Sequence, residues 1–221
     1  MERVAAIIAA AGRGERFGSP KQLYLLKGKT VLDWSLEKFE AHEAIDEIVL
    51  VLKEEQEKEK ILAHYKKIVA VVQGGKERQD SVLNGFKMID PEKTGIVLVH
   101  DGVRPLVSKA LISRVIEATL KKGAVIPALP LEDTVKEVAG KEVLRTLERQ
   151  ELCRVQTPQG FTYSILKKAL EKAQEEGYYG TDEASLVERA GESVFVVQGD
   201  PTNIKITVPE DLKVVESLLD D

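Results

Sequence analysis

Short apolar runs alternate with amphipathic stretches along most of this chain of 221 residues. The runs are rich in Val and Ile, as is typical of strands that are buried on both faces of a sheet. They are Val4–Ala9, Glu47–Leu52, Ile68–Val72, Ile96–His100, Ala124–Ala128 and Val194–Val197. Apolar residues at helical spacing follow in Ala110–Lys122 and after Tyr163, and Pro209 is expected in the first turn of a last helix. The alternation predicts the α/β class with a mostly parallel sheet flanked by helices.

One stretch, from Leu131 to Arg149, breaks this rhythm. Thr134–Val138 and Val143–Leu147 flank a turn that contains Gly140. This pattern predicts a β-hairpin inserted into the α/β arrangement. By itself, the pattern fits an ordinary surface hairpin.

Composition narrows the function classes. The formal net charge of −5 disfavours a binder of duplex nucleic acid, which needs a dense basic surface. The longest apolar run, Val4 to Ala11, is far too short to cross a bilayer, so no membrane partner is expected. Cys153 is the single cysteine, which excludes an intramolecular disulfide and fits a reducing, cytoplasmic location.

The first predicted strand runs into a glycine-rich loop at residues 10–21. Gly12 and Gly14 would let the backbone approach an anionic ligand closely. The spacing lacks the third glycine of a dinucleotide fingerprint and the Gly-Lys-Ser/Thr of a P-loop. What remains is a loop with three cations, Arg13, Arg16 and Lys21, in an acidic chain. Such a loop suits phosphoryl or nucleotidyl transfer, or it is a flexible loop with solvated charges.

Two further strand ends carry candidate chemistry. Gly74 and Gly75 precede a predicted helix, which Asp80 or Ser81 could simply cap. Asp101 ends another buried strand, where its carboxylate could bind Mg2+ or a ribose hydroxyl, or could pair with Arg104.

The C-terminal third adds two ambiguous signals. Thr181 is expected to be the N-cap of a helix. Lys205 interrupts an apolar alternation at residues 203–207, where a lysine either reaches solvent or binds an anion. The three histidines show no catalytic or metal-binding spacing, so we expect structural roles for them.

Together these segments resemble the 2-C-methyl-D-erythritol 4-phosphate cytidylyltransferase family of the non-mevalonate isoprenoid route, nearly end to end. Nine motifs in order at compatible spacing make the resemblance specific, although each motif alone is weak. The motifs are Ala10-Ala11-Gly12-x-Gly14-x-Arg16, Pro20-Lys21-Gln22, Gly74-Gly75-x-x-Arg78-x-Asp80-Ser81-Val82, His100-Asp101-x-x-Arg104-Pro105, Asp133-Thr134, Arg149, Thr157-Pro158-Gln159, Thr181-Asp182-Glu183-Ala184, and Asn203-Ile204-Lys205-Ile206-Thr207-x-Pro209-Glu210-Asp211-Leu212.

The resemblance implies a Rossmann-like fold of the nucleotidyltransferase type, with residues 1–221 as a single domain and a β-arm insertion at about 131–150. It implies transfer of a cytidylyl group from CTP to the acceptor, a polyol phosphate, with release of diphosphate. Mg2+ is implied as the cofactor, held mainly by the triphosphate and possibly by Asp101. The enzyme is expected to work as a homodimer joined through the arm.

The same resemblance implies roles for individual residues. Arg16 and Lys21 should stabilise the transition state at the α-phosphate, and Arg149 with Lys205 should position the acceptor phosphate. Thr134 and Arg149 should reach the neighbouring subunit's site on the arm. The remaining substrate-binding positions are Ala10, Ala11, Gly12, Gly75, Ser81, Asp101, Arg104 and Thr181. Because the acceptor phosphate and the triphosphate repel each other, gathering these cations with Mg2+ supplies orientation and charge neutralisation together.

Four other functions compete with this interpretation. Cytidylyl transfer to ribitol 5-phosphate would use similar Pro-Lys-Gln, Thr-Pro-Gln and Asn-Ile-Lys elements. A sugar-1-phosphate nucleotidyltransferase shares the glycine-rich loop but lacks the hairpin. A dinucleotide-dependent oxidoreductase is disfavoured by the missing third glycine. A non-catalytic nucleotide-binding module would not need cations around two anionic partners.

Overall fold

The computed structural model describes residues 2–12, 14, 17–18, 20–53 and 58–219, so Arg13 and Arg16 lie outside the described residues. All six predicted strands are present, one with the predicted bounds and five with shifted ends, which confirms the α/β class. They are β1 (Arg3–Ala10), β4 (Glu47–Leu52), β5 (Ile68–Gln73), β6 (Thr94–Asp101), β7 (Ala124–Pro130) and β12 (Phe195–Gln198). The helices of the described chain are α1 (Val31–Glu40), α2 (Lys58–His64), α3 (Arg78–Phe86), α4 (Lys109–Lys122), α5 (Tyr163–Glu175), α6 (Glu183–Arg189) and α7 (Pro209–Leu218).

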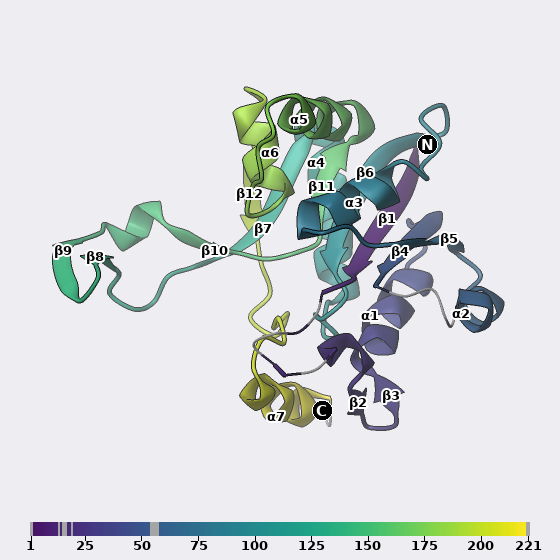
Figure 1. The fold of residues 1–221 in the computed structure, drawn as a ribbon, viewed down its shortest axis with the longest axis horizontal. Coiled ribbons are helices and arrows are strands. Elements are labelled where there is room, and N and C mark those ends of the chain that lie inside the picture. The colour runs from purple at the N-terminus through teal and green to yellow at the C-terminus, as the bar shows by residue number, and fades with distance from the viewer. Residues whose placement is uncertain (1, 13, 15–16, 19, 54–57, 220–221) are drawn as a thin grey trace.

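The main sheet has the strand order β10-β7-β11-β6-β1-β4-β5, with β12 paired to β7 (Figure 1). The β6-β1-β4-β5 half is parallel, and β12 is parallel to β7. Two antiparallel strands, β10 (Cys153–Val155) and β11 (Gln159–Thr162), are additions that the hydrophobic pattern did not predict. The sheet is therefore mostly parallel, as predicted, and mixed at one side.

β11 escaped prediction because it is short and polar at both ends. Its burial comes from its neighbours, β6 and β7 on either side and α4 above. At Gly160, a Cβ atom would come within 2.3 Å of the Thr119 hydroxyl on α4, so only glycine allows this close approach. The strand is specified by tertiary packing rather than by its own side chains.

Two apolar layers cover the sheet, and the pleat of β1 divides its side chains between them. Ala6 and Ile8 face a core that includes residues of α1 and α4, whereas Ala5 and Ile7 face a core built with α3, α5 and α6. This period of two, with both faces buried, explains why β1 reads as a continuous apolar run. A third cluster places Leu212 and Val215 of α7 beside Leu26 and Val31, below the sheet in Figure 1.

The predicted hairpin is present as β8 (Lys136–Ala139) and β9 (Glu142–Thr146), and we call the stretch 131–150 the arm. The turn is shorter than predicted, because Ala139 pairs with Glu142 and only Gly140 and Lys141 lie between them. Gly140 has a φ of +60°, as a two-residue turn requires. The arm projects far from the body of the molecule (Figure 1). In the described part of the chain, no helix combines the length and apolar character needed to span a bilayer.

Candidate active site

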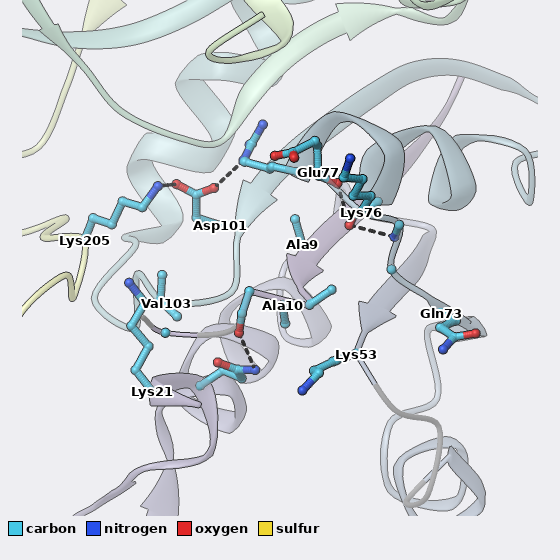
Figure 2. Close-up of a pocket in the computed structure, with 18 residues that line it drawn as sticks. Ala9, Ala10, Lys21, Lys53, Gln73, Lys76, Glu77, Asp101, Val103 and Lys205 are labelled. Atoms are coloured by element: carbon cyan, nitrogen blue, oxygen red, sulfur yellow. Dashed lines mark hydrogen bonds and ion pairs between the residues drawn. The ribbon is translucent and has the colours of Figure 1, made fainter. Parts of the chain in front are cut away.

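A cleft of about 970 Å³ opens at the carboxyl ends of β1, β4, β5 and β6 (Figure 2). Because these four strands are parallel, the loops that follow them gather at one edge of the sheet. Eight of the predicted site residues line this cleft, so motifs that are far apart in the sequence converge here. They are Ala10, Ala11, Gly12, Lys21, Gly75, Ser81, Asp101 and Lys205.

Two glycines after β5 allow one wall of the cleft to pack tightly. A Cβ atom on Gly74 would lie 2.2 Å from the Cβ of Ala11, and one on Gly75 would lie 2.2 Å from the Cβ of Asp80. Ser81 fixes the turn, since its hydroxyl accepts from the Gly75 N–H and donates to the Glu77 carbonyl. Asp80 accepts from the Glu77 N–H at the start of α3. The predicted capping role of Asp80 is thus present alongside the cleft-lining role of Ser81.

The glycine-rich loop forms the opposite wall. A Cβ atom on Gly12 would have no atom of the described residues within 4 Å, so among these residues the space in front of its backbone is open for a ligand. Gln22 is buried and donates from Nε2 to the Gly12 carbonyl, which ties the loop to the short 3-10 helix η1 (Lys21–Leu23). Lys21 is half-buried on η1 and faces the cleft.

Asp101, at the end of β6, lies among three cations. Its Oδ1 accepts from Arg78 Nε at 3.1 Å, and its Oδ2 lies 2.9 Å from Lys205 Nζ and 3.5 Å from Arg104 Nε. Burial by itself would raise the pKa of Asp101, but Arg78, Lys205 and Arg104 together hold that pKa well below its usual value. Asp101 is therefore ionised throughout the working pH range.

Arg78 is locked between the two sides of the cleft. Besides Asp101, its guanidinium holds Glu183 of α6 at 2.7 and 2.8 Å. Burial favours a lower pKa for Arg78, but the carboxylates of Glu183 and Asp101 raise it.

The N-cap of α6 is Asp182, which accepts from the Ser185 N–H, so the prediction of Thr181 as N-cap was wrong. Asp182 is one residue closer to the helix and has an acceptor of the same kind.

The apolar alternation around Lys205 would suit a strand, but residues 203–207 form no regular strand. Ile206 is buried and donates to the Val103 carbonyl, which anchors the segment beside the cleft. The side chain of Lys205 is 38% exposed and points to Asp101. The apolar alternation thus reflects packing of a loop against α7 and the segment around Val103 that follows β6, rather than strand pairing.

Among the described residues, five cations line the cleft, against the carboxylates of Asp101 and Glu77. Sequence reasoning selected Lys21 and Lys205 but missed Lys53, Lys76 and Arg78 as site residues. Lys53 directly follows β4, and Lys76 directly follows the Gly74-Gly75 turn after β5. Their position after parallel strands was the signal that could have identified them as site residues. An acidic chain thus concentrates positive charge at one place.

Four other predicted site residues are described but do not line the cleft, and Arg16 lies outside the described residues. Arg104 is 7% exposed and lies beneath Asp101, where its Nη1 donates to the Asn203 carbonyl, so it supports the cleft instead of lining it. Thr134 and Arg149 lie on the arm and are exposed, and Arg149 donates to the Glu132 carbonyl. Thr181 is exposed outside the cleft. A single chain therefore brings together one part of the predicted site.

Among the described residues of the cleft, Asp101 is the one side chain that suits a divalent cation. The described residues contain no cluster of three His, Cys, Asp or Glu side chains that could hold a metal. Asp101 is ionised, faces the cleft and retains lone pairs beyond those that accept from Arg78 and Lys205. Mg2+ commonly uses one or two carboxylates together with substrate phosphates, so Asp101 suits a cation carried by a triphosphate.

His100 lies directly behind this site. It is fully buried, its Nδ1 lies 3.0 Å from the Thr157 hydroxyl, and burial lowers its pKa to about 3. A neutral, enclosed imidazole fits the expected structural role.

Comparison with known proteins gives a consistent result. A sequence model of the family described as 2-C-methyl-D-erythritol 4-phosphate cytidylyltransferase matches residues 4–221. A relative of that name from Syntrophus aciditrophicus is 46% identical, over 98% of this chain and 96% of its own. Another from Bacillus pumilus is 44% identical, over 97% and 96%.

Solved structures agree with the sequence relatives. A 2-C-methyl-D-erythritol 4-phosphate cytidylyltransferase from Thermus thermophilus superposes with a TM-score of 0.84 at 34% identity, over the full length of both chains. A 4-diphosphocytidyl-2C-methyl-D-erythritol synthase from Anaerococcus prevotii gives a TM-score of 0.87 at 35% identity, covering 100% of this chain and 99% of that one.

Proposed function

Because the chain belongs to the 2-C-methyl-D-erythritol 4-phosphate cytidylyltransferase family, and so is a cytidylyltransferase of isoprenoid biosynthesis, we propose that the cation-lined cleft is its reaction centre. The observation that carries the proposal is the convergence of Lys21, Arg78 and Lys205 in one cleft of an acidic chain. Two polyanionic substrates repel each other, and such a cleft offsets that repulsion. The relatives' names favour methylerythritol phosphate over ribitol 5-phosphate as the acceptor.

The nucleotide binds between the glycine-rich loop and the Gly74-Gly75 turn. Ala10, Ala11 and Gly12 offer close backbone approach, and Gly75 with Ser81 completes the opposite side. Lys21, together with Arg16 in the same loop, neutralises charge that develops on the α-phosphate and the departing diphosphate. Each cation contributes mainly in the transition state, because charge is largest there.

The reaction needs no protein base. An ionised phosphate oxygen of the acceptor forms a bond to the α-phosphorus while the bond from phosphorus to the diphosphate oxygen breaks, and diphosphate leaves with that electron pair. Lys205 holds the acceptor phosphate in line, since its ammonium lies at the cleft beside Asp101. Mg2+, held by the triphosphate and by Asp101, would neutralise phosphate charge and polarise the phosphoryl group.

The acceptor half is completed by a second subunit. Thr134 and Arg149 lie on the projecting arm, away from the cleft of their own chain, and Arg149 suits bidentate contact with a phosphate. Val138, Val143 and Leu144 expose more than half of their surface on the arm, which supports a homodimer that covers them. Thr181 belongs to the acceptor side, and Arg104 acts through Asp101.

The remaining assignments concern the whole chain. Residues 1–221 form a single nucleotidyltransferase domain, with the arm at about 131–150 as an insertion. The free, exposed thiol of Cys153 supports a reducing, cytoplasmic location.

A diphosphate-release assay across four nucleoside triphosphates and two acceptors tests the function. We expect turnover with CTP and 2-C-methyl-D-erythritol 4-phosphate in the presence of Mg2+, and little with ribitol 5-phosphate. Chelation of divalent cations should abolish release. Preferred use of another triphosphate, or release that does not depend on an acceptor, would contradict the proposal.

A further inference from the structure

The segment 156–159, which links β10 to β11 and includes the first residue of β11, is polar and largely buried beside the proposed reaction centre. Gln156, Thr157 and Gln159 are each no more than 5% exposed. The segment enters directly from β10, the strand that returns from the arm, and continues into β11 at the middle of the sheet. Its polar side chains bind backbone groups and side chains of other segments, as buried polar groups require.

Gln156 binds the turn that precedes Lys205. Its Nε2 donates to the carbonyl oxygens of Asp200 at 2.8 Å and Asn203 at 3.3 Å, while its Oε1 accepts from the Asp200 N–H at 3.0 Å. The side-chain amide of Gln156 thus binds both the N–H and the carbonyl of Asp200, as a neighbouring strand's backbone would. Gly199 makes room for this, because a Cβ atom there would lie 2.6 Å from Gln156 Oε1.

The same turn is tied to Asp101 by a second route. Asn203 is fully buried, and its Nδ2 donates to the Thr157 carbonyl at 2.7 Å. The Thr157 hydroxyl accepts from the Asp101 N–H at 3.1 Å. Arg104 completes a closed circuit of contacts through Asn203, Thr157 and Asp101, since it contacts both the Asn203 carbonyl and the Asp101 carboxylate. Lys205 follows two residues after Asn203, so this circuit sets its distance from Asp101.

We propose that Gln156 is a positioning residue for Lys205: it fixes the 200–203 turn so that the ammonium of Lys205 is held at the acceptor phosphate. The inference rests on the proposed function only in naming the acceptor as the ligand of Lys205. A lysine with its several rotatable bonds gains precision only when its backbone is fixed, and a displacement of about 1 Å can cost up to 10²-fold in rate.

Gln159 provides an internal comparison, because it is a buried glutamine three residues away with a different target. Its Nε2 donates to Asp182 and its Oε1 accepts from the Ala184 N–H, so it holds the start of α6. That helix carries Glu183, the partner of Arg78. The two glutamines therefore support opposite sides of the cleft.

A double-mutant cycle between Gln156→Ala and Lys205→Ala tests the proposal. We expect Gln156→Ala to raise the KM for the acceptor on the order of tenfold, with the KM for CTP changed less than about twofold. In the Lys205→Ala background, Gln156→Ala should add less than about a twofold effect, because the side chain it positions is gone. Gln156→Met has a similar size and buries no charge, and it carries the test if the alanine variant does not fold.

Glu40→Ala is the matched control for lost stability. Glu40 also holds backbone N–H groups, those of Lys66 and Lys67, but at the opposite edge of the sheet. It should lower the melting temperature without the selective rise in acceptor KM. Additive effects of Gln156→Ala and Lys205→Ala, or no effect of Gln156→Ala, would overturn the inference and leave the proposed function intact.

Two outcomes separate the inference from the proposed function. If Lys205→Ala changes CTP kinetics instead, and Gln156→Ala is still non-additive with it, the acceptor assignment fails while the positioning role stands. If Lys205→Ala changes neither substrate's kinetics, both fail.

Discussion

Lys205 and Arg149 are both assigned to the acceptor phosphate, yet their surroundings differ sharply. Lys205 lies beside a buried carboxylate, directly after a turn held by buried amides. Arg149 lies on the arm, where every residue of β9 is exposed. Folding of one chain is thus sufficient to place the cation of the cleft, whereas the proposed role of Arg149 requires the arm to dock on a second subunit. On that proposal the site has a preorganised half and a half completed by assembly.

The largest expected effect lies in the preorganised half. Lys21→Ala should lower kcat by on the order of 10²-fold or more with little change in CTP binding, since this ammonium acts on charge that develops in the transition state. Arg16→Ala should behave similarly. Steady-state kinetics and CTP titration measure the two quantities, with the exposed Lys66→Ala as a control. Near-normal turnover of Lys21→Ala would contradict the assignment of Lys21 to transition-state stabilisation.

A smaller, selective effect is expected from the arm. Arg149→Ala should weaken acceptor use by about tenfold or more while CTP use stays close to normal, because a charged contact to one substrate is lost. The measurement is the KM for each substrate. An equal loss for both substrates would mean that Arg149 serves the nucleotide or the fold.

Mixing subunits separates the two halves directly. Dimers of one Arg149→Ala chain and one Lys21→Ala chain contain one intact site if the arm serves the neighbouring cleft. Random exchange should then restore about a quarter of wild-type activity. A mixture no more active than the sum of its parents would place Arg149 in its own chain's site.

The same division separates what sequence could predict from what it could not. Strand ends in a parallel sheet meet at one edge, so the convergence of Gly12, Gly75 and Asp101 followed from chain order alone. β11 did not follow, because it depends on neighbours distant in sequence. The true N-cap at Asp182 did not follow either, because Thr181 beside it is also a favourable cap residue. Likewise, the pattern at residues 203–207 could not distinguish a strand from a loop packed on both sides. Burial of Arg104 beneath Asp101 also required the tertiary structure.

The smallest expected effect concerns stability of the buried floor behind Asp101. Burial holds the pKa of His100 at about 3 in the folded chain, whereas a histidine in the unfolded chain titrates near its ordinary value of 6.5. Between these two values the unfolded state binds the extra proton, so the free energy of unfolding falls as pH decreases through this window. One such proton corresponds to about 1.4 kcal/mol per pH unit. His42, whose pKa burial also lowers, adds in the same direction.

Urea unfolding of wild-type protein and His100→Gln at several pH values between about 4.5 and 7.5 isolates this contribution. Restricting the range keeps Asp101 out of the comparison, because its lowered pKa affects stability only in more acidic solution. The slope of unfolding free energy against pH should be shallower in His100→Gln, whereas Val143→Thr on the arm should keep the wild-type slope. Equal slopes in wild type and His100→Gln would mean that the imidazole is hydrated or protonated in the folded chain. The buried region behind Asp101 would then admit water, and the cleft half of the site would be less preorganised than the comparison with the arm assumes.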